Sequence, residues 1–174
     1  MSIKAVIDTN VFVSAFWRDN EDSPPYRIYR AMMEQRFIPL YNDEIIAEYN
    51  DVLHRGKFRF PSRRVDELIM FIEKSGERIS PATPDVETFP DPDDRIFYCV
   101  ALAAQSDNAL LVTGNARHFP QAPLPEQGAS MATLARWAAW SRLSPSLQTP
   151  PPMHSISGWN ALMVLVIPAA RYMM

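Results

Sequence analysis

Several features that would quickly narrow the function of this 174-residue chain are scarce. Its single cysteine, Cys99, excludes an internal disulfide framework and a zinc site built from cysteines. It has only five glycines, and their spacing excludes a glycine-rich loop that cradles phosphate. The net charge is -3, so binding to a polyanion must rely on a local basic patch.

Long hydrophobic runs are also missing. The longest apolar stretch, about residues 161–170, is too short to span a bilayer and contains Pro168. The chain opens directly into a strand-like segment, so no signal peptide is expected. Together with the single cysteine, these features predict a cytoplasmic protein that does not associate with a membrane.

Short apolar segments alternate with segments of helical periodicity in the first two thirds of the chain. Strands are predicted for residues 3–8, 37–41 and 109–114. Helices are predicted for residues 11–17, 23–36, 42–55, 62–76 and 93–106, with Ser23, Asn42 and Ser62 as N-caps. This order predicts an α/β fold with a central parallel sheet covered by helices on both faces.

The composition changes after about Pro123. Only four charged residues lie in residues 121–174: Glu126, Arg136, Arg142 and Arg171. A helix is expected at residues 131–143, followed by a proline-rich segment. We therefore predict one domain over residues 1–143, with a linker and an atypical apolar tail over residues 144–174.

Polar residues gather where the predicted strands end. Ligand sites of parallel α/β sheets form at the carboxyl ends of the strands. Two helices add acids there, one at the margin of its apolar face and one in its first turn. The side chains expected at this edge are Asp8, Asn10, Glu48, Asp94, Thr113, Asn115 and His118.

Each of these signals has a structural explanation when it is taken alone. Asp8 can cap the next helix through an Asx turn, and the acids of residues 91–94 can cap another. A lone histidine is more often structural than functional. Taken together, Asp8, Glu48 and Asp94 would repel one another in one cleft unless a cation neutralised them. Three carboxylates favour Mg²⁺ or Mn²⁺ over zinc.

A basic stretch at residues 55–64, RGKFRFPSRR, interleaves five cationic side chains with two phenylalanines. Such a mixture suits phosphate contact and base stacking. The alternative is a solvated loop whose Phe58 and Phe60 dock in the core. The residues predicted to make such contacts are Arg55, Lys57, Arg59 and Arg63.

Four motifs, in order, resemble the PIN-domain family over about residues 3–123. They read AVIDTNVFVSAF, NDEIIAEY, PDPDDRIFYCVALA and LLVTGNARHFP. The likeness is strongest to VapC-like ribonucleases, the toxin components of bacterial toxin–antitoxin systems. The resemblance implies a metal-dependent ribonuclease on a three-layer α/β/α fold, which cleaves single-stranded RNA.

The resemblance also assigns roles to single residues. Asp8, Glu48 and Asp94 match the family's acids, which implies catalytic and Mg²⁺- or Mn²⁺-binding roles. The sequence departs from the family where Asn115, a catalytic candidate, and His118 stand in place of aspartates. Asn10, Thr113 and His118 are the candidates for substrate binding. A small antitoxin partner is expected, and a homodimer through helix faces that carry Met32, Met33 and Phe71.

Two other functions stay open at this stage. An Asp8-nucleophile phosphotransfer domain would need a lysine near a late strand end and an acid where Asn10 stands. A PIN fold that has lost its activity would bind RNA or a partner without cleaving. The changed positions 115 and 118 and the unusual tail support this second alternative.

Overall fold

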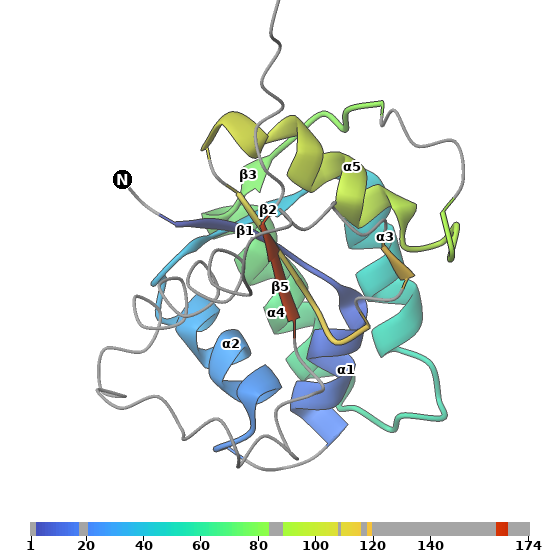
Figure 1. Ribbon diagram of the computed structural model, residues 1–174. Coiled ribbons are helices and arrows are strands. Elements are labelled where there is room, and N and C mark those ends of the chain that lie inside the picture. The colour runs from blue at the N-terminus through green and yellow to red at the C-terminus, as the bar shows by residue number, and fades with distance from the viewer. Residues whose placement is uncertain are drawn as a thin grey trace, which may run out of the picture.

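The computed structural model describes residues 3–17, 21–83, 89–107, 109–115, 118–119 and 163–166. Figure 1 shows the arrangement of its elements. Their order is β1 (Lys4–Ile7), α1 (Thr9–Trp17), α2 (Pro24–Met33), β2 (Ile38–Tyr41), α3 (Asp43–Leu53), α4 (Ser62–Ser75), β3 (Glu77–Arg78), α5 (Arg95–Ala103), η1 (Gln105–Asp107), β4 (Leu110–Thr113) and β5 (Met163–Val166).

The strands form one sheet in the order β3-β2-β1-β4-β5. The first four of these run parallel, and β5 pairs with β4 in the antiparallel direction. The predicted parallel α/β sheet is confirmed, with β1 at its centre. Two strands were not predicted: β3 has only two residues, and β5 lies in an apolar segment without a clear period.

Helices cover both faces of this sheet, as expected for a three-layer fold (Figure 1). Helix α5 contacts β1, β2 and β4, while α1 contacts β4 and α4 contacts β2 from the other side. The central strands are apolar because both of their faces are covered. Ala5, Val6 and Ile7 of β1 are accordingly almost completely buried.

The helix starts agree in part with the predicted caps. The Ser23 and Asn42 side chains accept the backbone N–H groups of Tyr26 and Ile45, so both N-caps are confirmed. Ser62 as a cap was wrong. Pro61 is the N-cap, and its carbonyl already accepts the N–H groups of the first turn, which makes Ser62 the first helical residue. Helix α5 begins at Arg95 rather than at residue 93.

The predicted helix at residues 131–143 lies outside the described residues, as does most of the predicted linker and tail. The exception is β5, which falls within residues 144–174 and joins the sheet. The proposed division of the chain after residue 143 stays a prediction. In the described part of the chain, no helix has both the length and the apolar character needed to cross a membrane.

Helix α4 ends against the sheet at Gly76, where there is no room for a side chain. A Cβ atom at this position would lie 2.5 Å from the Ile72 carbonyl oxygen and 2.6 Å from that of Pro39. Both neighbours are backbone atoms, which cannot move aside by changing rotamer. The close approach brings the end of α4 next to β2, and β3 starts at the following residue.

We therefore expect Gly76→Ala to lower the free energy of unfolding by about 1–3 kcal/mol, because the new methyl group overpacks the α4–β2 contact. Gly56→Ala is the matched control, because a Cβ there meets nothing within 4 Å. It should change the free energy by less than about 1 kcal/mol. Urea unfolding of both variants measures the difference. Equal stability of the two would contradict the close contact.

Candidate active site

Asp8 lies at the carboxyl end of β1 with its side chain buried, 2% exposed. Three donors surround its carboxylate. The Thr113 hydroxyl and the Asn10 side-chain amide each donate to Oδ2 at 2.5 Å, and the Asn10 backbone N–H donates to Oδ1 at 3.1 Å. The last bond closes an Asx turn, so that structural role is confirmed. Burial without these donors would be costly for a carboxylate.

Thr113 and Asn10 join the ends of β1 and β4. The Asn10 side-chain oxygen accepts the Gly114 N–H at 2.8 Å, and the Thr113 hydroxyl accepts the Asn115 N–H at 2.9 Å. Thr113 is completely buried. Both side chains orient Asp8, and their predicted contact with substrate stays a prediction.

Glu48 reaches the same edge from α3. Its side chain is half-buried, and its Oε1 accepts the Thr9 hydroxyl at 2.6 Å. The next residue, Tyr49, is buried and donates its hydroxyl to the Ile7 carbonyl of β1. This bond ties α3 to the strand that carries Asp8. The sequence did not predict that Thr9 would donate a hydrogen bond to Glu48, although Thr9 stands between Asp8 and Asn10, which were both predicted site residues.

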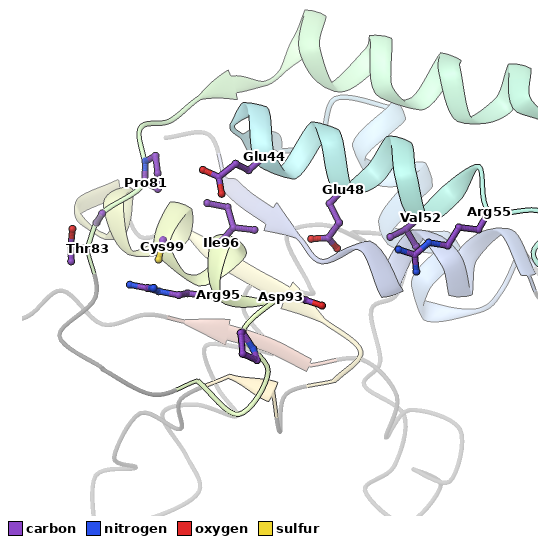
Figure 2. A pocket seen from close by; sticks show the side chains of 12 residues that line it. Glu44, Glu48, Val52, Arg55, Pro81, Thr83, Asp93, Arg95, Ile96 and Cys99 are labelled. Carbon is purple, nitrogen blue, oxygen red and sulfur yellow. The ribbon is translucent and has the colours of Figure 1, made fainter.

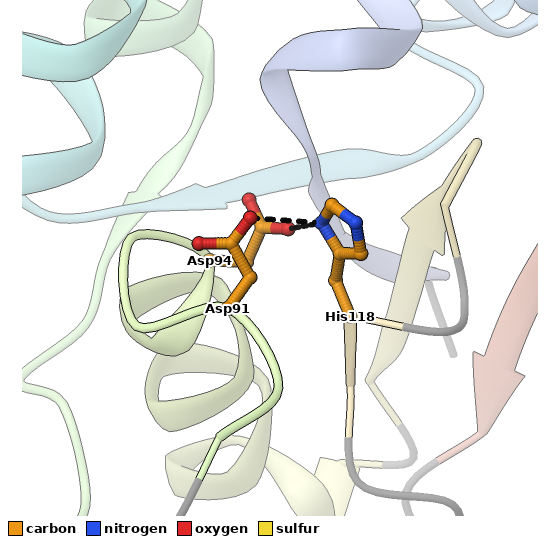
Figure 3. A group of neighbouring side chains, drawn as sticks. All are labelled: Asp91, Asp94 and His118. Carbon is orange, nitrogen blue, oxygen red and sulfur yellow. Dashed lines mark hydrogen bonds and ion pairs between the residues drawn. The ribbon is translucent and has the colours of Figure 1, made fainter.

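A second group of side chains lies where the turn before α5 meets the loop after β4 (Figure 3). His118 Nδ1 is 2.8 Å from Asp94 Oδ2 and 3.0 Å from Asp91 Oδ2. The Asn115 side-chain nitrogen is 2.7 Å from Nε2 of the same ring. The sequence placed Asp94, Asn115 and His118 at this edge, but Asp91 was assigned only to helix capping.

The acids influence one another electrostatically. The pKa of the Asp8 carboxyl is raised to about 6, chiefly by burial and to a smaller extent by the Asp94 charge, against the lowering effect of the hydrogen bonds from Thr113 and Asn10. Burial likewise raises the pKa of Glu48 to about 7, with further contributions from Asp8, Asp94 and Asp93. Burial also raises the pKa of Asp94, against the lowering effect of His118. The three acids therefore share one electrostatic environment.

A cleft of about 720 Å³ opens between α3 and α5 beside this group (Figure 2). Glu48 and Asp93 line it, together with two arginines, Arg55 and Arg95. Arg55 was predicted to contact RNA, and its guanidinium also pairs with Asp51 at 2.6 Å. Arg95 was not predicted, because it lies in a segment where the acids dominate the pattern. The cleft thus combines carboxylates with cationic side chains.

The basic stretch has its aromatic rings engaged and most of its charges exposed, while Arg64 is half-buried over the Phe16 ring. Phe60 packs against the core and stacks on Phe58, with ring centroids 5.4 Å apart. The alternative in which these rings dock is therefore confirmed for Phe60. Lys57 lies over the Phe58 ring at 4.7 Å, whereas Arg59 and Arg63 extend into solvent, and Arg63 also pairs with Glu67.

The donor set fits a divalent cation, but the tightest group differs from the predicted one. Among the described residues, one set of acids and histidines has ligand atoms within 4.8 Å of one another: Asp91, Asp94 and His118. Of the predicted ligands, Asp94 belongs to this set. Asp8 and Glu48 lie beside it and are coupled to it through their charges.

The raised pKa of Glu48 predicts a pH-dependent cost in stability. Below about pH 4.5 this carboxyl is protonated in both the folded and the unfolded states, and it carries no penalty. As the pH rises to about 7, the unfolded state ionises first, and the folded state loses stability. Glu48→Gln stays neutral, so in chelator it should unfold at higher urea than the wild type at pH 8.

The two proteins should unfold at the same urea concentration at pH 4. The matched control is Glu44→Gln, one turn earlier on α3 with an exposed side chain, which should leave the free energy of unfolding unchanged within about 0.5 kcal/mol. A Glu48→Gln variant that is less stable than the wild type at pH 8 would show that the carboxylate is stabilising there.

Comparison with known proteins gives one match. The model of the PIN domain family matches residues 4–117, which include the first three motifs and the fourth as far as residue 117. A search of curated proteins and a search of solved structures returned no match. The matched segment spans more than half of the chain and contains Asp8, Glu48 and Asp94. The chain therefore belongs to the PIN-domain family.

Proposed function

We propose that this protein is a divalent-metal-dependent endoribonuclease that cleaves single-stranded RNA. PIN domains are generally nucleases and bind nucleic acids. The observation that carries the proposal is the convergence of Asp8, Glu48 and Asp94, from three elements, on one electrostatically coupled edge beside an open cleft. Unpaired, such a concentration of carboxylates is costly, and a divalent cation offsets it.

The three acids have different proposed roles in the reaction. Asp8 and Asp94 hold Mg²⁺ or Mn²⁺, directly or through water, and Glu48 flanks the site. A bound ion of this kind lowers the pKa of water and offsets charge on the attacked phosphate. Glu48, with a pKa of about 7, is suited to accept a proton from the attacking water. Hydrolysis would leave a 5′-phosphate and a 3′-hydroxyl.

RNA binding is assigned to the cationic side chains around the cleft and the α3–α4 loop. Arg55 and Arg95 line the cleft, and Arg59 and Arg63 are exposed beyond it. Cationic side chains of this kind neutralise phosphates and draw the strand toward the acids. Lys57, which lies over Phe58, extends the same cationic surface.

The finer role we propose is the cytoplasmic toxin of a type II toxin–antitoxin pair. A small antitoxin would cover the acidic cleft, with a basic side chain placed against the carboxylates. A homodimer was predicted through Met32, Met33 and Phe71. Met32 is completely buried and was wrong as an interface residue, because its side chain belongs to the core. Met33 and Phe71 are only partly buried and stay candidates.

The phosphotransfer alternative has little support in this geometry. An Asp8 nucleophile would need a lysine near the carboxyl end of a late strand, whereas Lys4 lies at the opposite end of β1 from Asp8. Of the three lysines, Lys4 pairs with Glu77 and Asp107, and Lys57 lies over an aromatic ring. The other alternative is a PIN fold that binds RNA without cleaving it, and the activity assay described next tests it.

Asp8→Asn and Asp94→Asn should each lower metal-dependent RNase activity by about 100-fold or more, because each removes a charge from the reacting site. Asp107→Asn is the control, since this exposed acid pairs with Lys4 away from the acids. The assay uses single-stranded RNA, with and without EDTA, and circular dichroism to verify folding. Wild-type activity in either folded site variant would refute the assignment, and an inactive wild type would favour the non-cleaving alternative.

The charge-reversed variant Arg59→Glu/Arg63→Glu should bind RNA more weakly and with a flatter salt dependence. The slope of log K against log salt should fall by about 0.7 for each phosphate that the variant no longer neutralises. Arg36→Glu is the matched control, because this exposed arginine precedes β2 at the opposite edge of the sheet. Fluorescence anisotropy with Asp8→Asn as the common background avoids cleavage during the titration. Equal slopes for both variants would remove the loop from the binding surface.

A further inference from the structure

We infer that His118 is itself a metal ligand, so that this chain has a mixed nitrogen and oxygen site with Asp91 and Asp94. Such a site takes a first-row transition ion such as Mn²⁺, Co²⁺ or Zn²⁺ in preference to Mg²⁺. The inference deepens the proposed function, and it rests on that proposal only for the presence of a divalent cation at this edge of the sheet.

The spacing of the ligand atoms supports this assignment (Figure 3). His118 Nδ1 lies 2.8 Å from Asp94 Oδ2 and 3.0 Å from Asp91 Oδ2. An octahedral ion with bonds of about 2.1 Å holds neighbouring ligand atoms about 3.0 Å apart. His118 is thus spaced from each carboxylate as adjacent ligands of one ion are, and the ligand atoms of all three side chains lie within 4.8 Å of one another.

The His118 ring is held so that Nδ1 faces the two carboxylates. The Asn115 side-chain nitrogen lies 2.7 Å from Nε2 and 3.1 Å from Nδ1 of this ring, and the His118 backbone N–H donates to the Asn115 carbonyl at 3.0 Å. Neighbouring groups that contact a ligating imidazole limit its orientation. Asn115 is therefore a positioning residue for His118 in this arrangement.

The chemistry of the donors decides the ion. Mg²⁺ is a hard cation that is bound almost entirely by oxygen, whereas imidazole nitrogen suits the transition ions. The three side chains are partly buried, with exposures of 34% for Asp91, 15% for Asp94 and 26% for His118. An ion can reach them from solvent and still keep part of its water shell.

His54 provides a natural comparison within the same chain. Its Nε2 lies 3.4 Å from Asp66, and its Nδ1 lies 2.9 Å from the Asn50 carbonyl. Within the described residues, no group of three ligand atoms within 4.8 Å includes His54. A histidine beside one carboxylate does not make a chelating site, so His54→Asn is a matched control for His118→Asn.

The test is isothermal titration calorimetry of the full chain, stripped of metal with chelator, with MnCl₂, ZnCl₂ and MgCl₂ as separate titrants. The wild type and His54→Asn should bind Mn²⁺ and Zn²⁺ at least about tenfold more tightly than Mg²⁺, and His118→Asn should lose this preference. His118→Asp supplies an oxygen ligand and should shift the preference toward Mg²⁺. NMR of the histidine rings adds a direct readout, because Zn²⁺ should shift the His118 resonances before those of His54.

Equal affinity of the wild type for Mg²⁺ and Zn²⁺, or unchanged Zn²⁺ binding by folded His118→Asn, would overturn the inference. If RNase activity that depends on Asp8 accompanies either result, the inference fails and the proposed function stands. Tight Zn²⁺ binding through His118 without any RNase activity supports the inference and removes the proposed function. The two claims are therefore separable by their readouts.

Discussion

The buried carboxylate of Asp8 is the constraint on which the site depends. A carboxylate buried at the end of a central strand is tolerated only when donors replace the water it has lost. Here the donors come from Thr113 at the end of β4 and from Asn10 in α1. These bonds require β1 and β4 to be neighbours, and they require the chain to turn into α1 directly after β1. The local requirement of one acid thus helps to fix the centre of the fold.

The same edge collects more negative charge than its internal hydrogen bonds balance. Burial and mutual repulsion raise the pKa values of Asp8, Glu48 and Asp94 together. Only Asp94 has a cationic partner among the described residues, through His118, and that partner is charged only when it is protonated. A fold that keeps such a cluster gives up stability near neutral pH, which is reasonable where the acids serve a cation and a reaction.

Acidic and basic features occupy different parts of one surface. The carboxylates lie at the rim of the sheet, and Arg55 and Arg95 line the cleft beside them between α3 and α5. In this arrangement the arginines attract a polyanion, and the neighbouring carboxylates are left to act on it. A chain of net charge -3 can therefore bind an anionic substrate, because the local positive potential of the arginines attracts it despite the negative total charge.

Local patterns in the sequence predicted the three central strands, the helices up to β4 and two N-caps, because these features depend on neighbouring residues. The acids Asp8, Glu48 and Asp94 were also placed at one edge, since parallel strands end on the same side. The bond from Thr9 to Glu48, the group of Asp91 with His118, and the pairing of β4 with β5 were decided only by the tertiary structure. Each joins segments that are far apart in the chain, and no local hydrogen bond or periodicity records which distant partner a side chain will meet.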